Sequence, residues 1–223
     1  MSNPPTLLDA DGLASIATGL MMSHHAFRRD LCRFREALEA LDSSRIGALR
    51  AEWGNFHGAL HGHHEAEDTR IFPGLRAQHA ALAPTIEQLS ADHRRIDPLL
   101  DRGDDAFAQL PDPRAARVVI GELCELLAPH LEKEEAEVVP FLRHSAEFSP
   151  ANEAELQMYA DGFAWSAQGI AEDVLETVFA TLPAQLRERL PAARRKFAER
   201  CERVWGGVAT TQSRTPVPDG WRD

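Results

Sequence analysis

Apolar residues recur every three or four positions along almost the whole chain of 223 residues. This spacing is typical of amphipathic helices. Together with candidate caps and prolines, it predicts six helices, with expected ranges 9–41, 45–71, 84–102, 114–140, 152–181 and 184–205. The third helix is expected to fade at Arg102, Gly103 and Asp104, and the tail from Gly206 is expected to be mobile.

The first four expected helices are long and are joined by short links, which is the pattern of an antiparallel up-down four-helix bundle. The step Ser149-Pro150 separates them from the remainder of the chain. We therefore expect an all-α protein with a bundle over 1–147 and a C-terminal helical pair packed on it over 150–206. A mobile tail is expected over 207–223.

Charge and composition exclude several classes of protein. A net charge of −11 argues against nucleic acid as a partner, because an acidic chain repels phosphate backbones. The three cysteines are scattered, which indicates a reducing compartment, and the N-terminus has no signal-peptide pattern. No apolar run reaches the roughly 18 residues of a membrane span. We expect a cytoplasmic protein without membrane contact.

An internal repeat is the most informative pattern in the chain. Residues 60–75 read LHGHHEAEDTRIFPGL and residues 127–142 read LAPHLEKEEAEVVPFL. Both match L-x-x-H-x-x-x-E-[DE]-x-x-x-x-P-x-L, and nearly the same offset relates His24 to His93. The chain therefore carries two helix pairs, each with a lone histidine followed by a His-x-x-x-Glu motif.

The repeated motif has the chemistry of a metal site. Positions i and i+4 share one face of a helix, so a histidine and a glutamate at this spacing can reach one centre. Imidazole suits iron, copper and zinc, and carboxylates can bridge two ions. A lone core histidine is more often held by hydrogen bonds, but six residues at symmetric spacing favour a metal. The predicted ligands are His24, His63, Glu67, His93, His130 and Glu134.

At two of these positions the sequence offers more than one candidate ligand. His24 shares its face with apolar residues, whereas His25 shares its face with Arg28 and Arg29, so we select His24. On the second helix the pairs His61/Glu65 and His64/Asp68 also fit, and the repeat selects His63/Glu67. The remaining histidines are expected at the surface or beside ligands: His57, His61, His64, His79 and His144. We expect Asp68 and Glu135 either to be exposed or to orient a ligand histidine.

In combination, these segments resemble the bacterial form of the hemerythrin-like HHE cation-binding family. The segments are HHAFRRDL (24–31), LHGHHEAEDTRIFP (60–73), ADHRRID (91–97) and HLEKEEAEVVP (130–140). The resemblance implies a four-helix bundle with two iron ions that share carboxylates and an oxygen or hydroxide. The ligand roles fall on the six residues named above, and zinc or manganese fits the same ligands.

One departure from the oxygen-carrying members matters for function. Those members use five histidines, with a His-x-x-x-His on the third helix, whereas here Leu89 and Asp97 flank His93 at that spacing. Four histidines, two bridging carboxylates and one bridging oxygen leave two positions open on two six-coordinate irons. Open positions favour chemistry at the metal over reversible carriage. The sequence leaves undecided whether Asp97 or His64 also coordinates.

The expected function is a di-iron protein that reacts with O2, peroxide or nitric oxide, in stress protection or oxidase-type chemistry. If it is an enzyme, it is a di-iron oxidoreductase. One alternative is a module that binds or senses iron or oxygen without turnover. Another is a biosynthetic di-iron oxidase that acts on a small organic substrate. The sequence is compatible with a homodimer.

Overall fold

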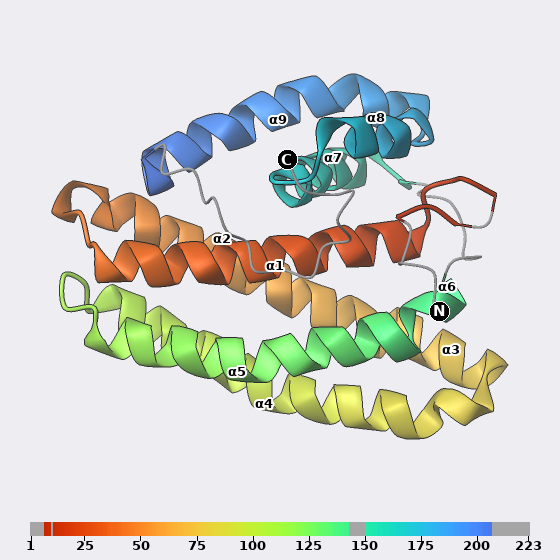
Figure 1. The fold of residues 1–223 in the computed structure, drawn as a ribbon, viewed down its shortest axis with the longest axis horizontal. Coiled ribbons are helices and arrows are strands. Elements are labelled where there is room, and N and C mark those ends of the chain that lie inside the picture. Colours follow the sequence, from red (N-terminus) through yellow and green to blue (C-terminus); the bar gives the residue numbers. More distant parts are fainter. Residues whose placement is uncertain (1–6, 10, 143–149, 207–223) are drawn as a thin grey trace. The chain divides into compact units, whose positions relative to one another are not determined.

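The computed structural model describes residues 7–9, 11–142 and 150–206, and all regular structure in these ranges is helical (Figure 1). The prediction of an all-α protein is therefore confirmed for this part of the chain. The helices are α1 (Ile16–Glu39), α2 (Ile46–Ala66), α3 (Phe72–Gln78), α4 (Ala83–Ala108), α5 (Arg114–Glu137), α6 (Val139–Leu142), α7 (Glu153–Ala167), α8 (Glu172–Ala180) and α9 (Ala184–Trp205).

The chain divides into two compact units. One unit contains residues 30–138 and 203–208, and therefore the C-terminal part of α1 with α2 to α5. The other contains the chain up to residue 29 together with residues 139–202. The domain boundaries expected from the sequence differ from this division and stay a prediction. The tail expected to be mobile lies outside the described residues.

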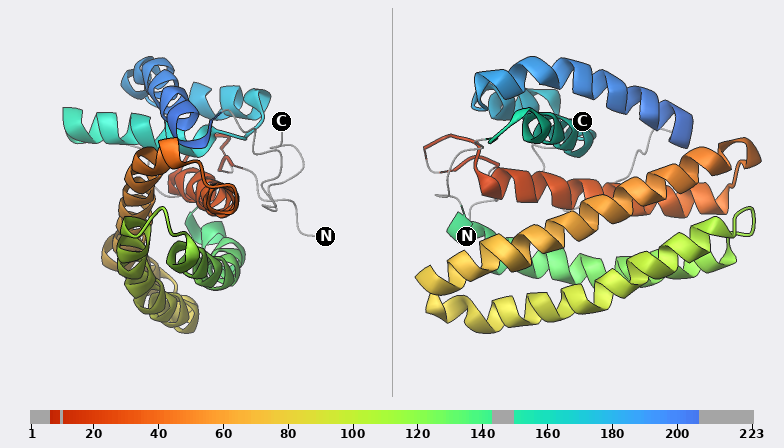
Figure 2. Two further views of the ribbon diagram at one scale, coloured as in Figure 1. Left: turned by 90° about the vertical axis from the view of Figure 1, so that its left-hand side faces the viewer. Right: turned by 180° about the vertical axis from the view of Figure 1, so that it is seen from behind.

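Phe34 organises the core of the unit that holds α2 to α5. Its ring meets Trp53, Phe56, Phe107 and Trp205 edge to face, with centroids 5.2 to 5.7 Å apart. Arg117 on α5 donates to the carbonyl of Leu38 at the end of α1, at 2.6 Å. These contacts draw α1, α2, α4 and α5 together, and α4 and α5 run side by side in both views of Figure 2.

The expected end of the third helix near Gly103 is wrong, because α4 continues to Ala108. A Cβ atom at Gly103 would lie 1.9 Å from Cζ2 of Trp53, so the missing side chain makes room for the indole ring. Trp53 then donates its Nε1–H to Asp104 at 2.7 Å. The glycine thus serves the packing of α2 on α4 and does not end the helix.

The expected start of the first helix at residue 9 is also wrong, because α1 begins at Ile16. Asp9 instead closes a turn, in which its carboxylate accepts the backbone N–H groups of Asp11 and Leu13 at 2.9 and 2.8 Å. Gly12 in this turn has φ +76°, a left-handed conformation that glycine adopts without strain. The aspartate therefore caps a turn that precedes the helix.

The helix expected over 152–181 is two helices, α7 and α8, so the described residues 150–206 contain three helices where a pair was expected. The break lies at Gly169, which has φ +88°. Gln168 beside it offers its carbonyl to the Nε2 of His25 at 2.9 Å. A left-handed residue ends α7 and turns the chain towards α8.

The face of α1 that carries His25 and Arg29 is buried, although its charges suggested a solvated face. Arg29 donates to the carbonyls of Trp165 and Gln168, both at 2.9 Å, and its guanidinium lies over the Trp165 ring. A planar cation with several donors suits this position, because α7 ends with carbonyls that lack helical partners. The arginine therefore attaches the end of α7 to α1.

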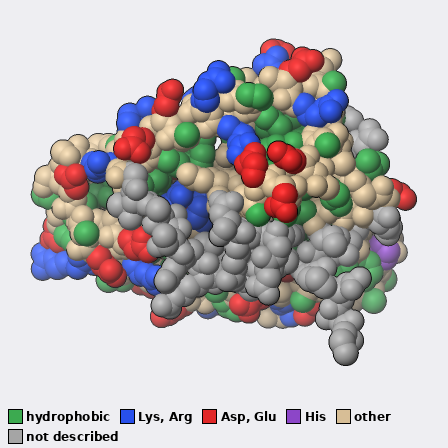
Figure 3. Space-filling model, turned by 45° about the horizontal axis from the view of Figure 1, so that its top comes forward, with side chains coloured by type: hydrophobic (Ala, Val, Ile, Leu, Met, Phe, Trp, Pro, Cys, Tyr) green, Lys and Arg blue, Asp and Glu red, His purple; other side chains and the backbone are tan. Residues whose placement is uncertain are grey.

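On the surface shown in Figure 3, acidic and basic side chains are interspersed with apolar ones. Exposed ion pairs of this kind include Arg194 with Glu172 at 2.8 Å, which links α9 to α8. Among the residues that the structure describes, no helix combines the length and the apolar composition that a membrane span requires.

Candidate metal centre

Both copies of the repeat leave regular α-helix at or after their glutamate, the first through a π-helical turn and the second through a break at Val138. In the first copy, α2 passes into a π-helical turn over Glu67–Ile71 before α3 begins. In the second, α5 ends at Glu137 and α6 begins at Val139. The proline six residues after each glutamate cannot donate a helical hydrogen bond and crowds the preceding turn. Irregular turns of this kind are frequent at functional sites because they re-aim the side chains near them.

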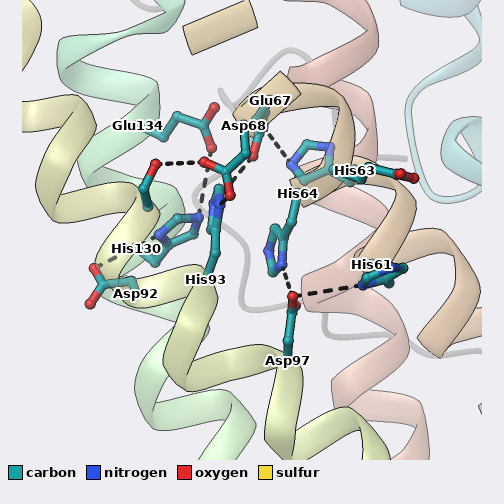
Figure 4. A network of polar contacts seen from close by, with 12 residues as sticks. His61, His63, His64, Glu67, Asp68, Asp92, His93, Asp97, His130 and Glu134 are labelled. Carbon is teal, nitrogen blue, oxygen red and sulfur yellow. Dashed lines mark hydrogen bonds and ion pairs between the residues drawn. The ribbon is translucent and has the colours of Figure 1, made fainter. Parts of the chain in front are cut away.

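Three histidines from three helices form the first half of a buried cluster. His64 of α2, His93 of α4 and His130 of α5 each offer one ring nitrogen, and these atoms lie within 4.8 Å of one another (Figure 4). Each side chain is at most 2% exposed. Three imidazoles at this spacing are a donor set that a transition metal can bind.

The second half of the cluster brings carboxylates together with His63. One donor atom from each of His63, Glu67 and Glu134 lies within 4.8 Å of the others. His63 Nε2 is 3.0 Å from Glu67 Oε1, and the side chains of both glutamates are completely buried. Two buried carboxylates side by side are costly without a compensating cation, so their burial favours a metal site.

Glu67 lies between the two halves of the cluster. Its Oε1 faces His63, whereas its Oε2 lies 3.4 Å from the Nε2 of His93. Glu134 is placed similarly, with Oε2 4.0 Å from the Nε2 of His130. Each glutamate therefore reaches both groups of ligands, as a carboxylate that bridges two ions must.

Carboxylates lie beside the outer nitrogens of the three histidines and accept hydrogen bonds from two of them (Figure 4). The Nδ1–H of His93 donates to Asp68 at 2.9 Å, and that of His64 donates to Asp97 at 3.1 Å. Asp92 lies 3.9 Å from the Nδ1 of His130. Metal-ligating histidines commonly donate their second N–H to a carboxylate, which fixes the ring and leaves the other nitrogen for the metal. Asp68 thus makes the contact with a histidine that its expected orienting role requires.

The charges of these pairs shift their pKa values. Burial lowers the pKa of His64 to about 4, although Asp97 opposes the shift. For His93, burial lowers the pKa, but the carboxylates of Glu67 and Asp68 outweigh it and raise the pKa above its ordinary value. The hydrogen bond from His64 lowers the pKa of Asp97. His64 is therefore neutral at pH 7, which is the form that binds a metal.

The remaining histidines have different surroundings. His57 contacts Asp104 at 3.0 Å at the surface, and the exposed His61 lies 3.7 Å from Asp97. His79 is partly exposed, and His144 lies outside the described residues. His64 is buried among the cluster, so of the two places expected for it, at the surface or beside ligands, the structure shows the second.

The periodicity of α2 could have placed His64 correctly. Trp53, Phe56 and Leu60 are buried, and steps of three and four residues continue this stripe to His64 and Glu67. His63 lies at the edge of the stripe and is slightly more exposed. The repeat selected His63 by its distance to the proline and carried no information about His64.

Five of the six predicted ligands thus come together in one unit: His63, Glu67, His93, His130 and Glu134. The sixth, His24, is completely buried on α1 and belongs to the other unit. Coordination by these residues is not tested by the geometry alone, and the ligand set stays a prediction. Asp97, considered as a ligand, contacts His64 and His61 instead of joining either half of the cluster.

A family model supports the assignment of the cluster to a metal. The model of the hemerythrin HHE cation binding domain matches residues 15–142, which is more than half of the chain and includes every residue of the cluster. Neither the curated proteins nor the solved structures gave a match.

Proposed function

The chain belongs to the hemerythrin HHE cation-binding family, and we propose that its buried cluster holds two iron ions that react with O2, peroxide or nitric oxide. The proposed ligands are His24, His63, Glu67, His93, His130 and Glu134. An antiparallel arrangement of α1, α2, α4 and α5 as a four-helix bundle is part of this proposal.

The position of Glu67 is the observation that carries the proposal of two ions. Its two oxygens face histidines of different groups, His63 at 3.0 Å and His93 at 3.4 Å. A site for a single ion needs only one group of three or four donors in one shell. Here the donors form two groups that share carboxylates, which supports two ions with bridges between them.

The donor types suit iron and argue against copper(I) and against a thiolate zinc site. Imidazole with carboxylate suits iron, and no thiolate is among the donors, as copper(I) and many structural zinc sites would require. The described cysteines, Cys32, Cys124 and Cys201, are not in disulfides, which suits the reducing cytosol in which we place the protein. Zinc and manganese remain competitors for the same ligands.

When bound, two ferrous ions would supply two electrons, the number needed to convert one peroxide and two protons to two waters. The residues of the chain would position the ions and exclude water. The side chains of Glu67 and Glu134 are completely buried, and Phe72 stacks on the ring of His93 with centroids 5.8 Å apart. Such an enclosed site favours small reactants.

Stopped-flow spectroscopy on the iron-loaded chain tests this function. The protein is loaded with ferrous iron without oxygen and mixed separately with O2, peroxide and nitric oxide. We expect oxidation of both irons by O2 or peroxide, and repeated consumption of the oxidant when a reductant is present. The same chain loaded with zinc is the control.

The alternatives give different results in the same experiment. Reversible loss of O2 under vacuum, without oxidation, would support a binding or sensing module. Oxidation that proceeds only after a small organic molecule is added would support a biosynthetic oxidase. No change in the spectrum with any of the three reactants would contradict the proposed reactivity.

A further inference from the structure

We infer that His64 is a metal ligand and that Asp97 is its positioning residue, so that the centre contains five imidazoles. This inference rests on the proposed metal site and identifies a ligand beyond the six predicted from the sequence. It starts from the place of His64 among His93 and His130, with one donor atom from each within 4.8 Å of the others.

The two nitrogens of His64 have different surroundings. Nδ1 donates to Asp97 at 3.1 Å, so Nε2 carries the lone pair of the neutral ring. Nε2 is buried, and no hydrogen-bond partner for it is found among the described residues. A buried polar atom without a partner is destabilising, which makes such atoms rare. A metal ion bound at Nε2 would remove this cost.

The ring of His64 is held in place by its neighbours. It stacks on His93, with centroids 4.1 Å apart and an angle of 12° between the planes. His130 meets it edge to face at 5.8 Å. The side chain is 2% exposed, whereas the neighbouring His61 is 55% exposed. His64 is therefore built into the cluster, and His61 is not.

The pair of His64 with Asp97 mirrors the pair of His93 with Asp68. In the first pair α2 supplies the histidine and α4 the aspartate. In the second pair α4 supplies the histidine, and the π-helical turn that follows α2 supplies the aspartate (Figure 4). Both aspartates are partly exposed and both bind Nδ1, so both histidines turn Nε2 inward. If His93 is a ligand that Asp68 orients, the same geometry makes His64 a ligand that Asp97 orients.

A fifth imidazole changes the number of open positions. With four histidines, two bridging carboxylates and one bridging oxygen, two positions stay open on two six-coordinate irons. With His64 added, one position stays open. This is the number that five histidines leave in the oxygen-carrying members, so the count of open positions no longer favours reaction over reversible binding. A single open position suits O2, peroxide or nitric oxide bound through one atom. An organic substrate that must chelate both irons is disfavoured.

The variant His64→Gln tests the inference, with His61→Gln as the matched control. Both residues lie on α2 and contact Asp97, and glutamine keeps an N–H that can reach a carboxylate. Metal content and affinity are measured with ferrous iron and with cobalt(II), in competition with a chelator. Unfolding temperatures are measured for the metal-free and metal-loaded forms.

We expect His64→Gln to lose one of two metals or to bind metal at least about tenfold more weakly. The rise in unfolding temperature on metal loading should shrink, and the visible spectrum of the cobalt form should change. His61→Gln should match the wild type. Asp97→Asn, which keeps the imidazole, should weaken affinity less and serves as the second variant if His64→Gln does not fold.

The outcomes separate this inference from the function on which it rests. A wild-type chain that binds no metal would overturn both. A wild-type chain with two metals, and a His64→Gln chain with the same two at the same affinity, would overturn the inference alone. So would equal losses of unfolding temperature in the metal-free and metal-loaded forms, because that result describes a structural residue.

Discussion

Asp68 and His93 lie 25 residues apart in the sequence and are joined by a 2.9 Å hydrogen bond between Oδ2 and Nδ1. Ser90 donates to the other oxygen of Asp68, so the carboxylate is fixed on both sides. The bond directs Nε2 of His93 towards Glu67, at 3.4 Å. Asp68 thus orients His93 without belonging to either donor group.

Replacement of Asp68 by Asn should weaken metal binding by about 10–100-fold, because the amide is uncharged and holds the imidazole less firmly. Chelator competition measures the change. Asp105→Asn is the control, because Asp105 is exposed on α4, the helix that carries His93, and lies outside the donor groups. Equal affinity of the Asp68→Asn and Asp105→Asn chains would show that the hydrogen bond does not support the site.

Replacement of Glu67 by Gln should lower the metal content of the loaded chain from two ions to one or fewer. The amide offers one oxygen, so it cannot join the donors around His63 to those around His93. Elemental analysis after gel filtration measures the content. Glu65→Gln is the matched control, since Glu65 is exposed two residues away. Two ions retained in the Glu67 variant would argue against a bridging role.

Replacement of Gly103 by Ala should lower the free energy of unfolding by about 1–3 kcal/mol, because the new methyl group would collide with Trp53. Urea denaturation measures the change. Gly54→Ala on α2 is the control: nothing lies within 4 Å of its Cβ position, so alanine should stabilise the helix by up to about 1 kcal/mol. A neutral Gly103→Ala would mean that Trp53 is free to move aside.

Replacement of Arg29 by Met should lower the free energy of unfolding by about 2–3 kcal/mol. Methionine fills part of the space but leaves the carbonyls of Trp165 and Gln168 without the guanidinium. Urea denaturation followed by tryptophan fluorescence measures the loss. Arg35→Met, at an exposed position of α1, should change stability by less than about 0.5 kcal/mol. Similar losses of unfolding free energy in both variants would show that Arg29 does not attach α7 to α1.

The sequence predicted most of the helices and most of the residues that meet in the buried cluster, because both depend on periodicity. The spacing of apolar residues predicted α2, α4, α5 and α9. Most of the ends of these helices lie within a few residues of the predicted positions. The repeat predicted that His63, Glu67, His130 and Glu134 meet, and the structure brings these residues together. A helix face is a local property, so local patterns indicate it.

The errors of the sequence analysis come from contacts between distant residues. Gly103 looked like a helix end because its partner, Trp53, lies fifty residues earlier. Arg29 looked solvated because the carbonyls that it binds belong to α7. The sequence left the role of His64 undecided because Asp97, which turns its Nε2 inward, lies on another helix. None of these partners can be inferred from spacing along one helix.

Elemental analysis of the purified chain, combined with its absorption spectrum, tests the central claim most directly. The account predicts two iron ions per chain and the ultraviolet absorption of oxidised iron joined by an oxygen. One ion per chain, or none after loading with excess ferrous iron, would contradict the di-iron site.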